Sequence, residues 1–495
     1  MSTEGPAATP ARSANPTHPA NPANPAIAAW ESVLAYAPRL LEHLRGFDRQ
    51  PGFQLAVAVD GTVIGGCAGG FADVATRTPM NTDHQFRIAS HSKVFTATAI
   101  LQLAETRKLT LEDALADHLP ELAGTDAGDV TVGELLSHSS GLTRDGDDSD
   151  FWVLGRPFPG RAALLETSAH GKVIARHEHF KYTNIGYGLL GLVIEAASGQ
   201  DYRTYTRKHL IAALELAGTG PDLDSGADRL ATGYGSLTVA GEPYTLERRT
   251  VIEHIDTGAL SSATGFYSTA ADVVRFLSAL LPEAADRAGT GALLGEHSKR
   301  RMQRRIEAAG LPGRHYGLGL ILQDVHGQAT FGHSGGYPGH ITRSWALPET
   351  GVALSVLTNA IDGPATSWGE QLIALASLAA REVPASYSGL RRADLARFTG
   401  RFAGLWGLHD IVDLAGKLYV LPLGSPLDPE TTEPLEVVDA SRLRSRDPDG
   451  FAGYGEELVF EFDDAGAAAV RGPGGMRFVR QADYTVPARL PAPPG

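Results

Sequence analysis

The chain of 495 residues exceeds the usual size of one domain, so we expect two globular units with tails. Hydrophobic residues make up 43% and charged residues 20%, as in ordinary globular proteins, and the net charge of −14 argues against nucleic acid as a partner. The single cysteine, Cys67, excludes an internal disulfide framework and cannot build a structural zinc site by itself.

Residues 1–26 are rich in Ala, Pro, Asn and Thr, which predicts a disordered tail. They lack the basic and apolar regions of a signal peptide. No apolar run in the chain reaches the roughly 18 residues of a membrane-spanning helix, so we predict no membrane span. These observations lead us to expect a cytoplasmic protein.

Helices and strands are predicted over residues 27–383. An amphipathic pattern predicts a helix over Ile27–Leu44, and the turn residues Asp60-Gly61 predict a hairpin of the strands Phe53–Val59 and Thr62–Gly66. Apolar periodicity and capping residues predict further helices at Ser90–Arg107, Thr131–Ser137, Gly186–Ser198, Thr269–Leu281 and Ser367–Arg381.

Two of these helices begin with the spacing of a capping box, Thr131 with Glu134 and Thr269 with Asp272. Residues Tyr316–Leu357 contain three apolar segments separated by turns, which predicts neighbouring antiparallel strands. The sequence therefore indicates an α+β fold, with an antiparallel β-sheet flanked by helices.

The composition changes after residue 383. Residues 384–392 are predicted to be a linker, and residues 393–485 a small β-barrel or sandwich, because short alternating runs are punctuated by Gly and Pro. These runs include Lys417–Leu421, Glu457–Phe462 and Met476–Arg480. A Pro-rich tail is expected over residues 486–495.

The tetrad Ser90-His91-Ser92-Lys93 is an S-x-x-K motif at the start of a predicted helix. Positions i and i+3 lie one turn apart on the same helix face, so the Lys93 amine would reach the Ser90 hydroxyl. A lysine can take the proton of a serine only when burial or nearby positive charge lowers its pKa. The tetrad therefore makes Ser90 a candidate nucleophile and Lys93 a candidate base.

Two further motifs follow the tetrad. Tyr182 and Asn184 stand two apart in a loop before a predicted helix, where a tyrosine could share the proton with Lys93. His333 begins the segment His333-Ser334-Gly335-Gly336 on a predicted strand, whose small residues would let a substrate backbone pair with it. His333 itself is interpreted as a group that can bind or move a proton near pH 7.

These motifs resemble those of the serine β-lactamase and penicillin-binding protein superfamily, in particular its class C-like branch, over about residues 27–383. Phe86–Lys93 looks like the nucleophile motif, Tyr182-Thr183-Asn184 like the Y-x-N motif, and His333-Ser334-Gly335 like the third motif. Leu135–Leu142 and Leu357-Thr358-Asn359 are supporting segments. The resemblance implies a sheet flanked by helices, an all-helical lobe, and a lipocalin-like C-terminal barrel.

The resemblance also implies the role of each residue. Ser90 would become acylated, Lys93 and Tyr182 would together form the general base, and Asn184 would bind the substrate amide. The backbone N–H groups of Ser90 and Gly336 would form the oxyanion hole, next to Gly335 on the same strand. Which of Lys93 and Tyr182 holds the proton stays open.

Two other interpretations compete with this one. Gly332–Gly336 fits G-x-S-x-G, in which Ser334 would be the nucleophile, but that motif requires a strand, a sharp turn and a helix, whereas Pro338 and Gly339 follow here. His177-Glu178-His179 could suggest a metal site, but no third ligand of suitable spacing stands out. We expect neither a metal nor a cofactor.

The reaction is predicted from three features of the chain. The third motif begins with His333, where β-lactamases have a lysine; a signal peptide is lacking; and a β-domain follows. Penicillin-binding-protein-type thioesterases and D-aminopeptidase-like enzymes combine these features, and the intervals of 92 residues from Ser90 to Tyr182 and 151 from Tyr182 to His333 are similar to those of the thioesterases.

The leading hypothesis is a stand-alone thioesterase that releases and cyclises, head to tail, a nonribosomal peptide ending in a D-residue. The alternative is a D-stereospecific aminopeptidase, amidase or carboxylesterase with the same acyl-enzyme. A catalytically inactive binding protein is disfavoured by the intact Ser90, Lys93 and Tyr182. The peptide's length and the oligomeric state are not indicated.

A basic segment suggests a partner. Five basic residues lie close together in an otherwise acidic chain: Lys299, Arg300, Arg301, Arg304 and Arg305. Such a run is either a solvated helix face or a docking patch for an acidic carrier protein that delivers the peptidyl thioester.

Overall fold

The computed structural model describes residues 9–10, 24–282, 293–308, 312–384, 387, 392–424, 427–448 and 453–486. Most of the two predicted tails and much of the predicted linker at 384–392 lie outside the described residues. The described chain divides into two compact units. Unit 1 comprises the described residues up to Asn24 together with Ala37–Gly369, and unit 2 comprises Pro25–Tyr36 together with the residues from Glu370 onward.

Two helices are shared between the units. Helix α1 (Pro25–Phe47) contains Pro38, and the division between the units falls just before this proline. Helix α11 (Ala365–Ala380) is divided after Gly369. Neither unit is therefore one continuous stretch of chain.

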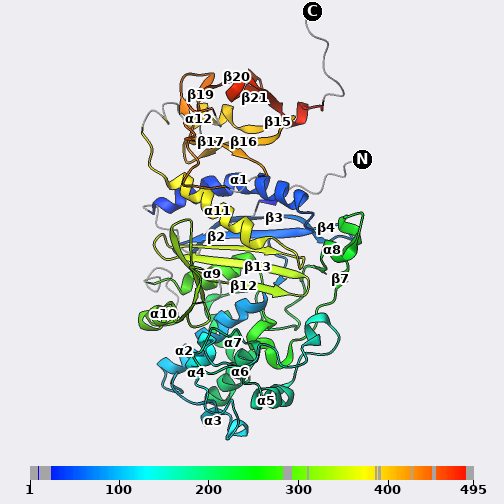
Figure 1. Ribbon diagram of the computed structural model, residues 1–495, viewed down its shortest axis with the longest axis vertical. Coiled ribbons are helices and arrows are strands. Elements are labelled where there is room, and N and C mark those ends of the chain that lie inside the picture. The colour runs from blue at the N-terminus through cyan, green and yellow to red at the C-terminus, as the bar shows by residue number, and fades with distance from the viewer. Residues whose placement is uncertain are drawn as a thin grey trace, which may run out of the picture. The chain divides into compact units, whose positions relative to one another are not determined.

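Unit 1 is built on an antiparallel sheet, in which ten strands occur among the described residues (Figure 1). The order along the sheet is β1-β3-β2-β14-β13-β12-β11-β10-β9, with β4 paired to β3. The strands are β1 (Thr9–Pro10), β2 (Gly52–Val59), β3 (Thr62–Asp73), β4 (Thr78–Pro79), β9 (Glu307–Ala308), β10 (His315–Tyr316), β11 (Ile321–Val325), β12 (Gln328–Tyr337), β13 (His340–Leu347) and β14 (Val352–Thr358).

Helices of unit 1 cover the sheet and build a helical lobe beside it (Figure 1). Helix α9 (Ala270–Ala279) packs on β2 and β14, and the lobe contains α2 to α7. These and the remaining short elements are α2 (Ser92–Glu105), α3 (Leu115–His118), α4 (Val132–Ser137), α5 (Arg161–Ala169), α6 (Asn184–Ser198), α7 (Tyr202–Thr206), α8 (Leu237–Ala240), α10 (Glu296–Met302), and the strand pairs β5 (Phe86–Arg87) with β8 (Tyr267–Ser268) and β6 (Gly233–Tyr234) with β7 (Val251–Ile252).

The predicted capping boxes are formed to different degrees. At α4, the Thr131 hydroxyl accepts from Glu134 N at 3.2 Å, and the Glu134 carboxylate accepts from Thr131 N at 2.8 Å, so the box is complete. At α9, the Thr269 hydroxyl accepts from Asp272 N at 3.2 Å, but the Asp272 carboxylate accepts from Gly218 N at 2.7 Å. Asp272 thus ties the helix start to a distant loop and does not complete the box.

The prediction of three strands over Tyr316–Leu357 is wrong in its middle segment. This segment contains β12 and β13, joined by a turn at Pro338-Gly339, where three segments would require one continuous strand. Gly339 has φ of 90°, a conformation that disfavours residues with a side chain, and an added Cβ would lie 2.6 Å from Gly233 Cα. Four main strands, β11 to β14, therefore follow one another in antiparallel order.

Unit 2 contains an antiparallel sheet that forms a nearly closed barrel, with eight strands among the described residues. The order is β17-β16-β15-β22-β21-β20-β19-β18. The strands are β15 (Gly400–Gly404), β16 (Gly407–Leu414), β17 (Lys417–Pro422), β18 (Glu436–Val437), β19 (Arg442–Arg444), β20 (Glu457–Asp463), β21 (Gly466–Arg471) and β22 (Arg477–Arg480); helix α12 (Arg392–Leu395) precedes them.

The barrel encloses its own core, in which Phe398, Phe402, Leu418 and Phe460 pack together. The N-terminal part of α1 belongs to the same unit, because the Tyr36 hydroxyl donates to the buried Asp410 carboxylate at 2.7 Å. Within the described residues, none of the helices combines the length and the hydrophobicity that crossing a membrane requires.

Candidate active site

Ser90 lies in a short 3-10 helix (Ala89–His91) that leads directly into α2. The preceding residue, Ala89, has φ of +47°, in the left-handed region that non-glycine residues rarely adopt. Such a conformation costs about 1–3 kcal/mol and occurs preferentially at functional sites. The strained residue turns the chain from β5 into α2 and presents Ser90 at the start of the helix.

The Ser90 hydroxyl contacts two of its predicted partners. The Tyr182 hydroxyl donates to Ser90 Oγ at 2.9 Å, and Lys93 Nζ donates to the same oxygen at 3.3 Å. Nucleophile and candidate bases are therefore assembled from three places in the chain, the turn before α2, α2 itself and the loop before α6.

Lys93 is completely buried. Its Nζ also donates to Asn184 Oδ1 at 2.7 Å and to the Ala263 carbonyl at 2.8 Å. Burial holds the pKa of Lys93 well below its usual range; the Asp145 carboxylate opposes this shift, and the Arg144 guanidinium adds to it. Burial therefore makes the neutral amine, which can accept a proton, easier to form here than at an exposed lysine.

Asn184 is fixed by both ends of its amide. Its Oδ1 accepts from Lys93, and its Nδ2 donates to Asp145 Oδ1 at 2.7 Å. It is the first residue of α6, whose start is capped by Thr183 Oγ1 accepting from Gly186 N at 2.9 Å. The cap and the carboxylate together set the direction of the Asn184 side chain.

Tyr182 lies among aromatic rings. Lys93 Nζ is 4.8 Å from the centroid of its ring, and the His138 ring centroid is 4.3 Å away. Burial raises the pKa of Tyr182, while the hydrogen bond with Ser90 lowers it by a smaller amount. The phenol is therefore neutral at neutral pH and able to donate its proton.

His138 belongs to the motif-like segment Leu135–Leu142 but was not assigned a role from the sequence. It ends α4 in the left-handed conformation, with φ of 62°. Thr183 N donates to His138 Nδ1 at 3.1 Å, which places the proton of the neutral ring on Nε2. Burial lowers the pKa of His138 well below its usual range, and the Lys93 charge adds to the shift.

His333 differs from the prediction of a group that titrates near pH 7. It is buried on β12, with Nε2 bonded to the Tyr316 hydroxyl at 2.9 Å and Nδ1 to the Ser334 carbonyl at 2.6 Å. Burial lowers the pKa of His333 well below its usual range, and His91 and Lys93 lower it further. A neutral His333 supports Tyr316 and the strand, and among the described residues its ring has no hydrogen bond to Ser90.

The two predicted glycines lie on β12 beside the start of α2. A Cβ at Gly335 would lie 2.3 Å from the Ile88 carbonyl and 2.4 Å from Thr342 Oγ1, so only glycine lets the strand approach this closely. Gly336 is exposed on the same strand. The strand therefore passes close to the nucleophile turn and leaves an open edge at Gly336.

Ser334 does not have the setting of a nucleophile elbow. Strand β12 continues through Ser334 to Tyr337 and is followed by a turn and by β13, whereas the elbow requires a helix. In the part of the chain that the structure describes, no cluster of three or more His, Cys, Asp or Glu side chains is arranged to hold a metal ion. His177, from the second alternative motif, bonds instead to Glu134 Oε1 at 2.9 Å.

A surface cavity of about 430 Å³ adjoins the site. Asp145, the partner of Asn184, lines one side of it, and Phe151 and Ile185 contribute apolar walls. Glu166 and Lys172 add charged groups to the lining. Its lining includes Asp145 and Ile185, on either side of Asn184, but not Ser90, Lys93 or Tyr182.

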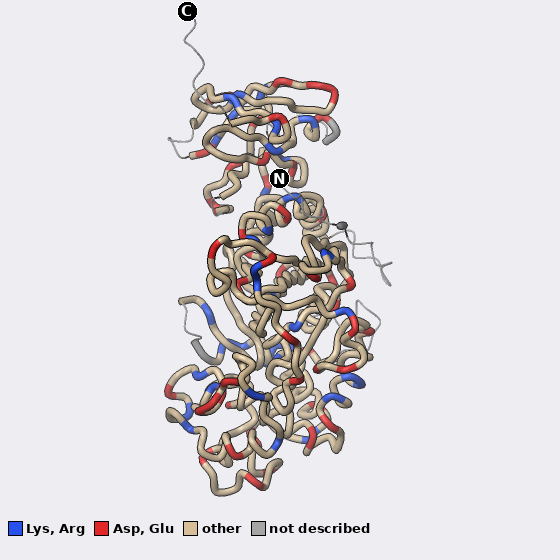
Figure 2. Tube along the Cα trace, turned by 90° about the vertical axis from the view of Figure 1, so that its right-hand side faces the viewer, with Lys and Arg blue, Asp and Glu red and all other residues tan. Residues whose placement is uncertain are grey.

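The basic segment is less uniform than its sequence suggested. Lys299 is buried in α10, where Nζ donates to the Leu281 carbonyl at 3.1 Å and pairs with Glu296 at 3.2 Å. Arg301 pairs with Glu112 at 3.0 Å, whereas Arg300, Arg304 and Arg305 are exposed. Figure 2 shows acidic and basic positions interspersed along much of the trace.

Several residues of the site carried no signal in the sequence. Ala263 acts through its backbone carbonyl, which any residue supplies. Asp145 stands in a loop with several other aspartates, so its residue type does not single it out. Tyr316 and His138 could have been found only from their contacts with His333 and Tyr182.

Known proteins with similar structures share this arrangement of elements. The structure described as SurE has a TM-score of 0.58 and 25% identity, covering 92% of this chain and 100% of that one; SurE with D-Leu gives a TM-score of 0.56 at the same identity. The D-amino acid amidase from Ochrobactrum anthropi SV3, complexed with D-phenylalanine, has a TM-score of 0.58 and 25% identity, covering 71% of this chain and 98% of the amidase.

Sequence comparison leads to the same group. Penicillin-binding protein 4 from Amycolatopsis lactamdurans is 30% identical over 384 residues, which cover 72% of this chain and 94% of that protein. The family model described as Beta-lactamase matches residues 38–377, which include the nucleophile turn, the Tyr182 loop and strand β12. The chain therefore belongs to the Beta-lactamase family, as the three motifs predicted.

Proposed function

We propose that the protein is a serine acyl-transferase that forms an acyl-enzyme on Ser90. The observation that carries this proposal is the convergence of the Tyr182 hydroxyl and the buried Lys93 amine on Ser90 Oγ, at 2.9 and 3.3 Å. A serine is a weak nucleophile unless an adjacent group takes its proton, and both neighbours lie within reach.

Lys93 acts as the base in this proposal. Its lowered pKa and the raised pKa of Tyr182 both favour the pair of neutral amine and neutral phenol over the pair of ammonium and phenolate. Ser90 Oγ attacks the substrate carbonyl while its proton passes to Lys93 Nζ. The proton then returns through Tyr182 to the leaving thiolate or amine, so that charges balance when the acyl-enzyme is formed.

The substrate is proposed to be a peptidyl thioester that ends in a D-residue. The likeness to SurE extends over 92% of the chain, and a structure of SurE holds D-Leu. The cavity beside Asp145 supports a long acyl chain. The peptide's own N-terminal amine then attacks the Ser90 ester. Because the amine is tethered within a folded acyl chain, its effective concentration at the ester is high, which favours ring closure over hydrolysis by water.

A D-stereospecific amidase is the second candidate. It is supported by the likeness to the amidase from Ochrobactrum anthropi SV3, whose structures hold D-phenylalanine and L-phenylalanine amide. This enzyme would form the same acyl-enzyme and differ in the acceptor, which would be water. The two candidates are therefore distinguished by the product that leaves Ser90.

We expect a cyclic product when the protein is incubated with a peptidyl thioester mimic that ends in a D-residue, because ring closure within the bound chain outcompetes hydrolysis. Mass spectrometry separates the cyclic peptide from the linear acid, which is heavier by one water. The matched control is the same peptide with an L-residue at its C-terminus, for which turnover should fall.

If both peptides give the linear free acid and no cyclic product, the protein is a hydrolase and not a cyclase. Turnover of D-phenylalanine amide in preference to the thioester would favour the amidase. Absence of turnover and of any adduct on Ser90 would contradict the acyl-enzyme itself.

We also propose that an acidic carrier protein docks on the exposed residues Arg304 and Arg305, which follow α10. Reversing two charges, in Arg304→Glu/Arg305→Glu, is expected to slow the capture of a carrier-bound peptide by about tenfold, because complementary charge mainly raises the association rate. Turnover of a small thioester mimic should not change. Stopped-flow or single-turnover kinetics at two salt concentrations measure this difference.

The control for this prediction reverses an exposed charge elsewhere. Arg77→Glu alters the turn between β3 and β4 and should leave capture unchanged. Equal slowing in both variants, or no slowing in either, would mean that the residues after α10 are merely a solvated surface.

A further inference from the structure

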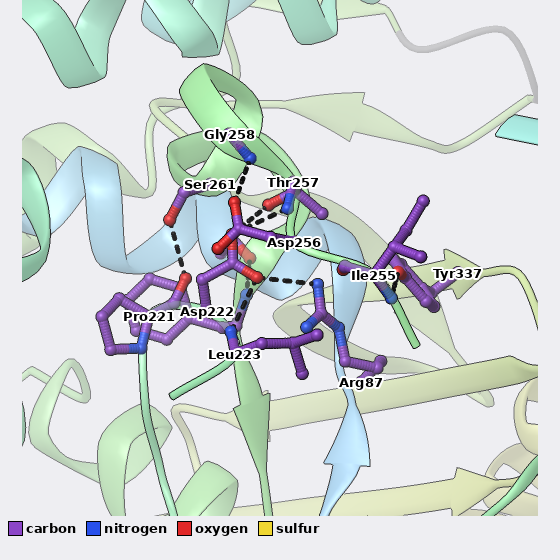
Figure 3. Close-up of polar contacts among 12 residues, drawn as sticks. Arg87, Pro221, Asp222, Leu223, Ile255, Asp256, Thr257, Gly258, Ser261 and Tyr337 are labelled. Carbon is purple, nitrogen blue, oxygen red and sulfur yellow. Dashed lines mark hydrogen bonds and ion pairs between the residues drawn. The ribbon is translucent and has the colours of Figure 1, made fainter. Parts of the chain in front are cut away.

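A buried ion pair lies behind the active site, outside the group that contacts Ser90. Arg87 Nη2 donates to Asp222 Oδ1 at 3.1 Å, and both side chains are fully buried (Figure 3). Two charges lose their hydration at such a position, and exchange of a buried pair for apolar residues is often neutral or stabilising. A contribution to stability is thus a weak explanation for this ion pair. Its contacts suggest instead that it positions the segments around it.

Arg87 connects the pair to the nucleophile. It is a residue of β5, which is followed at once by Ile88, the strained Ala89 and Ser90. The backbone on either side is also held, because Ile88 N donates to the Phe266 carbonyl at 2.9 Å. The position of the guanidinium therefore fixes the strand from which the nucleophile turn departs.

Asp222 connects the ion pair to the backbone carbonyl that accepts a hydrogen bond from Lys93. Its Oδ2 accepts from Thr257 N at 3.0 Å and from Thr257 Oγ1 at 2.5 Å (Figure 3). Thr257 precedes two short helices, residues 258–260 and 261–265, and the second contains Ala263, whose carbonyl accepts from Lys93 at 2.8 Å.

The same short helices are pressed against the Asp222 segment. Ser261 Oγ donates to the Pro221 carbonyl at 2.7 Å (Figure 3). A Cβ at Gly265 would lie 2.7 Å from the Pro221 carbonyl and 3.0 Å from Asp222 Oδ2, so the glycine permits close approach. A shift of Asp222 would consequently be transmitted to Ala263.

Tyr337 connects the pair to the third motif. The Arg87 guanidinium carbon lies 4.5 Å from the centroid of the Tyr337 ring, and the Tyr337 hydroxyl donates to the Ile255 carbonyl at 3.0 Å. Tyr337 directly follows Gly336 on β12. Nε and Nη1 of Arg87 have no hydrogen-bond partner among the described residues, so Asp222 and Tyr337 are its main anchors.

We propose that Arg87 and Asp222 are positioning residues that hold Ser90, the Ala263 carbonyl and Gly336 in the relative geometry that acylation requires. This inference rests on the proposed acyl-enzyme. Neither residue touches the reacting atoms, and each acts through a neighbour: Arg87 through β5 and Tyr337, and Asp222 through Thr257 and the helix of Ala263. Misplacement of reacting groups by about 1 Å can slow a reaction about 100-fold.

The test compares two double variants that each remove an ion pair. Arg87→Met/Asp222→Asn removes both charges here and with them the 3.2 Å pair of Asp222 with Arg203, whereas Arg249→Met/Asp362→Asn removes a pair of 2.7 Å elsewhere in unit 1. The probe is a fluorophosphonate, whose phosphorus bonds to Ser90 Oγ as fluoride leaves and the hydroxyl proton passes to the base. Labelling of the first variant is expected to be about 100-fold slower and that of the control unchanged.

Melting temperature and circular dichroism are recorded for each variant, because a merely structural pair would change the melting temperature without changing the labelling rate. The pH dependence of labelling is the second readout. Displacement of the Ala263 carbonyl alters the surroundings of Lys93, so we expect the midpoint of the pH profile to move in the first variant alone.

Each outcome bears on one hypothesis. Failure of the unmodified protein to be labelled at Ser90 would contradict the proposed function, whereas equal labelling rates of a folded Arg87→Met/Asp222→Asn variant and the unmodified protein would contradict the positioning role. If that variant does not fold, Thr257→Val replaces it, since it keeps the ion pair and removes one hydroxyl donor to Asp222. An unchanged rate and pH profile of Thr257→Val would overturn the inference.

Discussion

Replacement of Ser90 by Ala is expected to abolish the covalent adduct and to lower turnover of a peptidyl thioester by about 10⁴-fold or more, since removal of a nucleophile costs several orders of magnitude. The change deletes one oxygen, the atom to which both Tyr182 and Lys93 donate. Mass spectrometry of the intact protein after brief incubation with the substrate measures the adduct.

Ser334→Ala is the matched control, because it deletes the hydroxyl of the competing G-x-S-x-G motif. Ser334 lies within β12, where the setting of a nucleophile elbow is lacking, so the adduct should form at the normal rate. An adduct that survives in Ser90→Ala and disappears in Ser334→Ala would reverse the assignment of the nucleophile.

Replacement of Lys93 by Met is expected to have the second large effect. Acylation should slow by about 10³-fold, which is within the range for the loss of a general base. Methionine fills a similar volume and needs no hydration, so the variant should remain folded. It leaves Asn184 Oδ1 and the Ala263 carbonyl without their lysine donor, which a small fall in melting temperature should report.

The pH profile identifies the role of Lys93. Acylation by the unmodified protein should increase with pH as Lys93 loses its proton, and should level off below the usual pKa range of lysine, because burial lowers the pKa of this group. In Lys93→Met this rise should be absent. A Lys93→Met variant that keeps both the rate and the rise would transfer the role of base to Tyr182.

The sequence predicted most of the residues that meet at Ser90, because their functional groups are specific to their residue types. Ser90, Lys93 and Tyr182 each supply a functional group that no other residue type supplies equally well, and the structure brings these groups to one point. The α4 capping box was likewise predicted from Thr131 and Glu134 because its bonds are local. The roles of the residues in the reaction remain predictions.

What the sequence did not predict depends on contacts between distant segments. The turn at Pro338-Gly339 was missed although Pro-Gly is a local turn signal, and its tight geometry depends on Gly233, about 100 residues earlier. The lowered pKa of His333 could not be predicted from its residue type, because it depends on burial among distant segments.

The division of α1 between the units has a consequence for the order in which the protein is synthesised. Pro25–Tyr36 leaves the ribosome long before the other residues of its unit, which begin at Glu370. At about 5–20 residues per second, its apolar side chains, Trp30 and Val33 among them, wait tens of seconds for the barrel. Unit 2 can thus be completed only after the barrel residues have been synthesised.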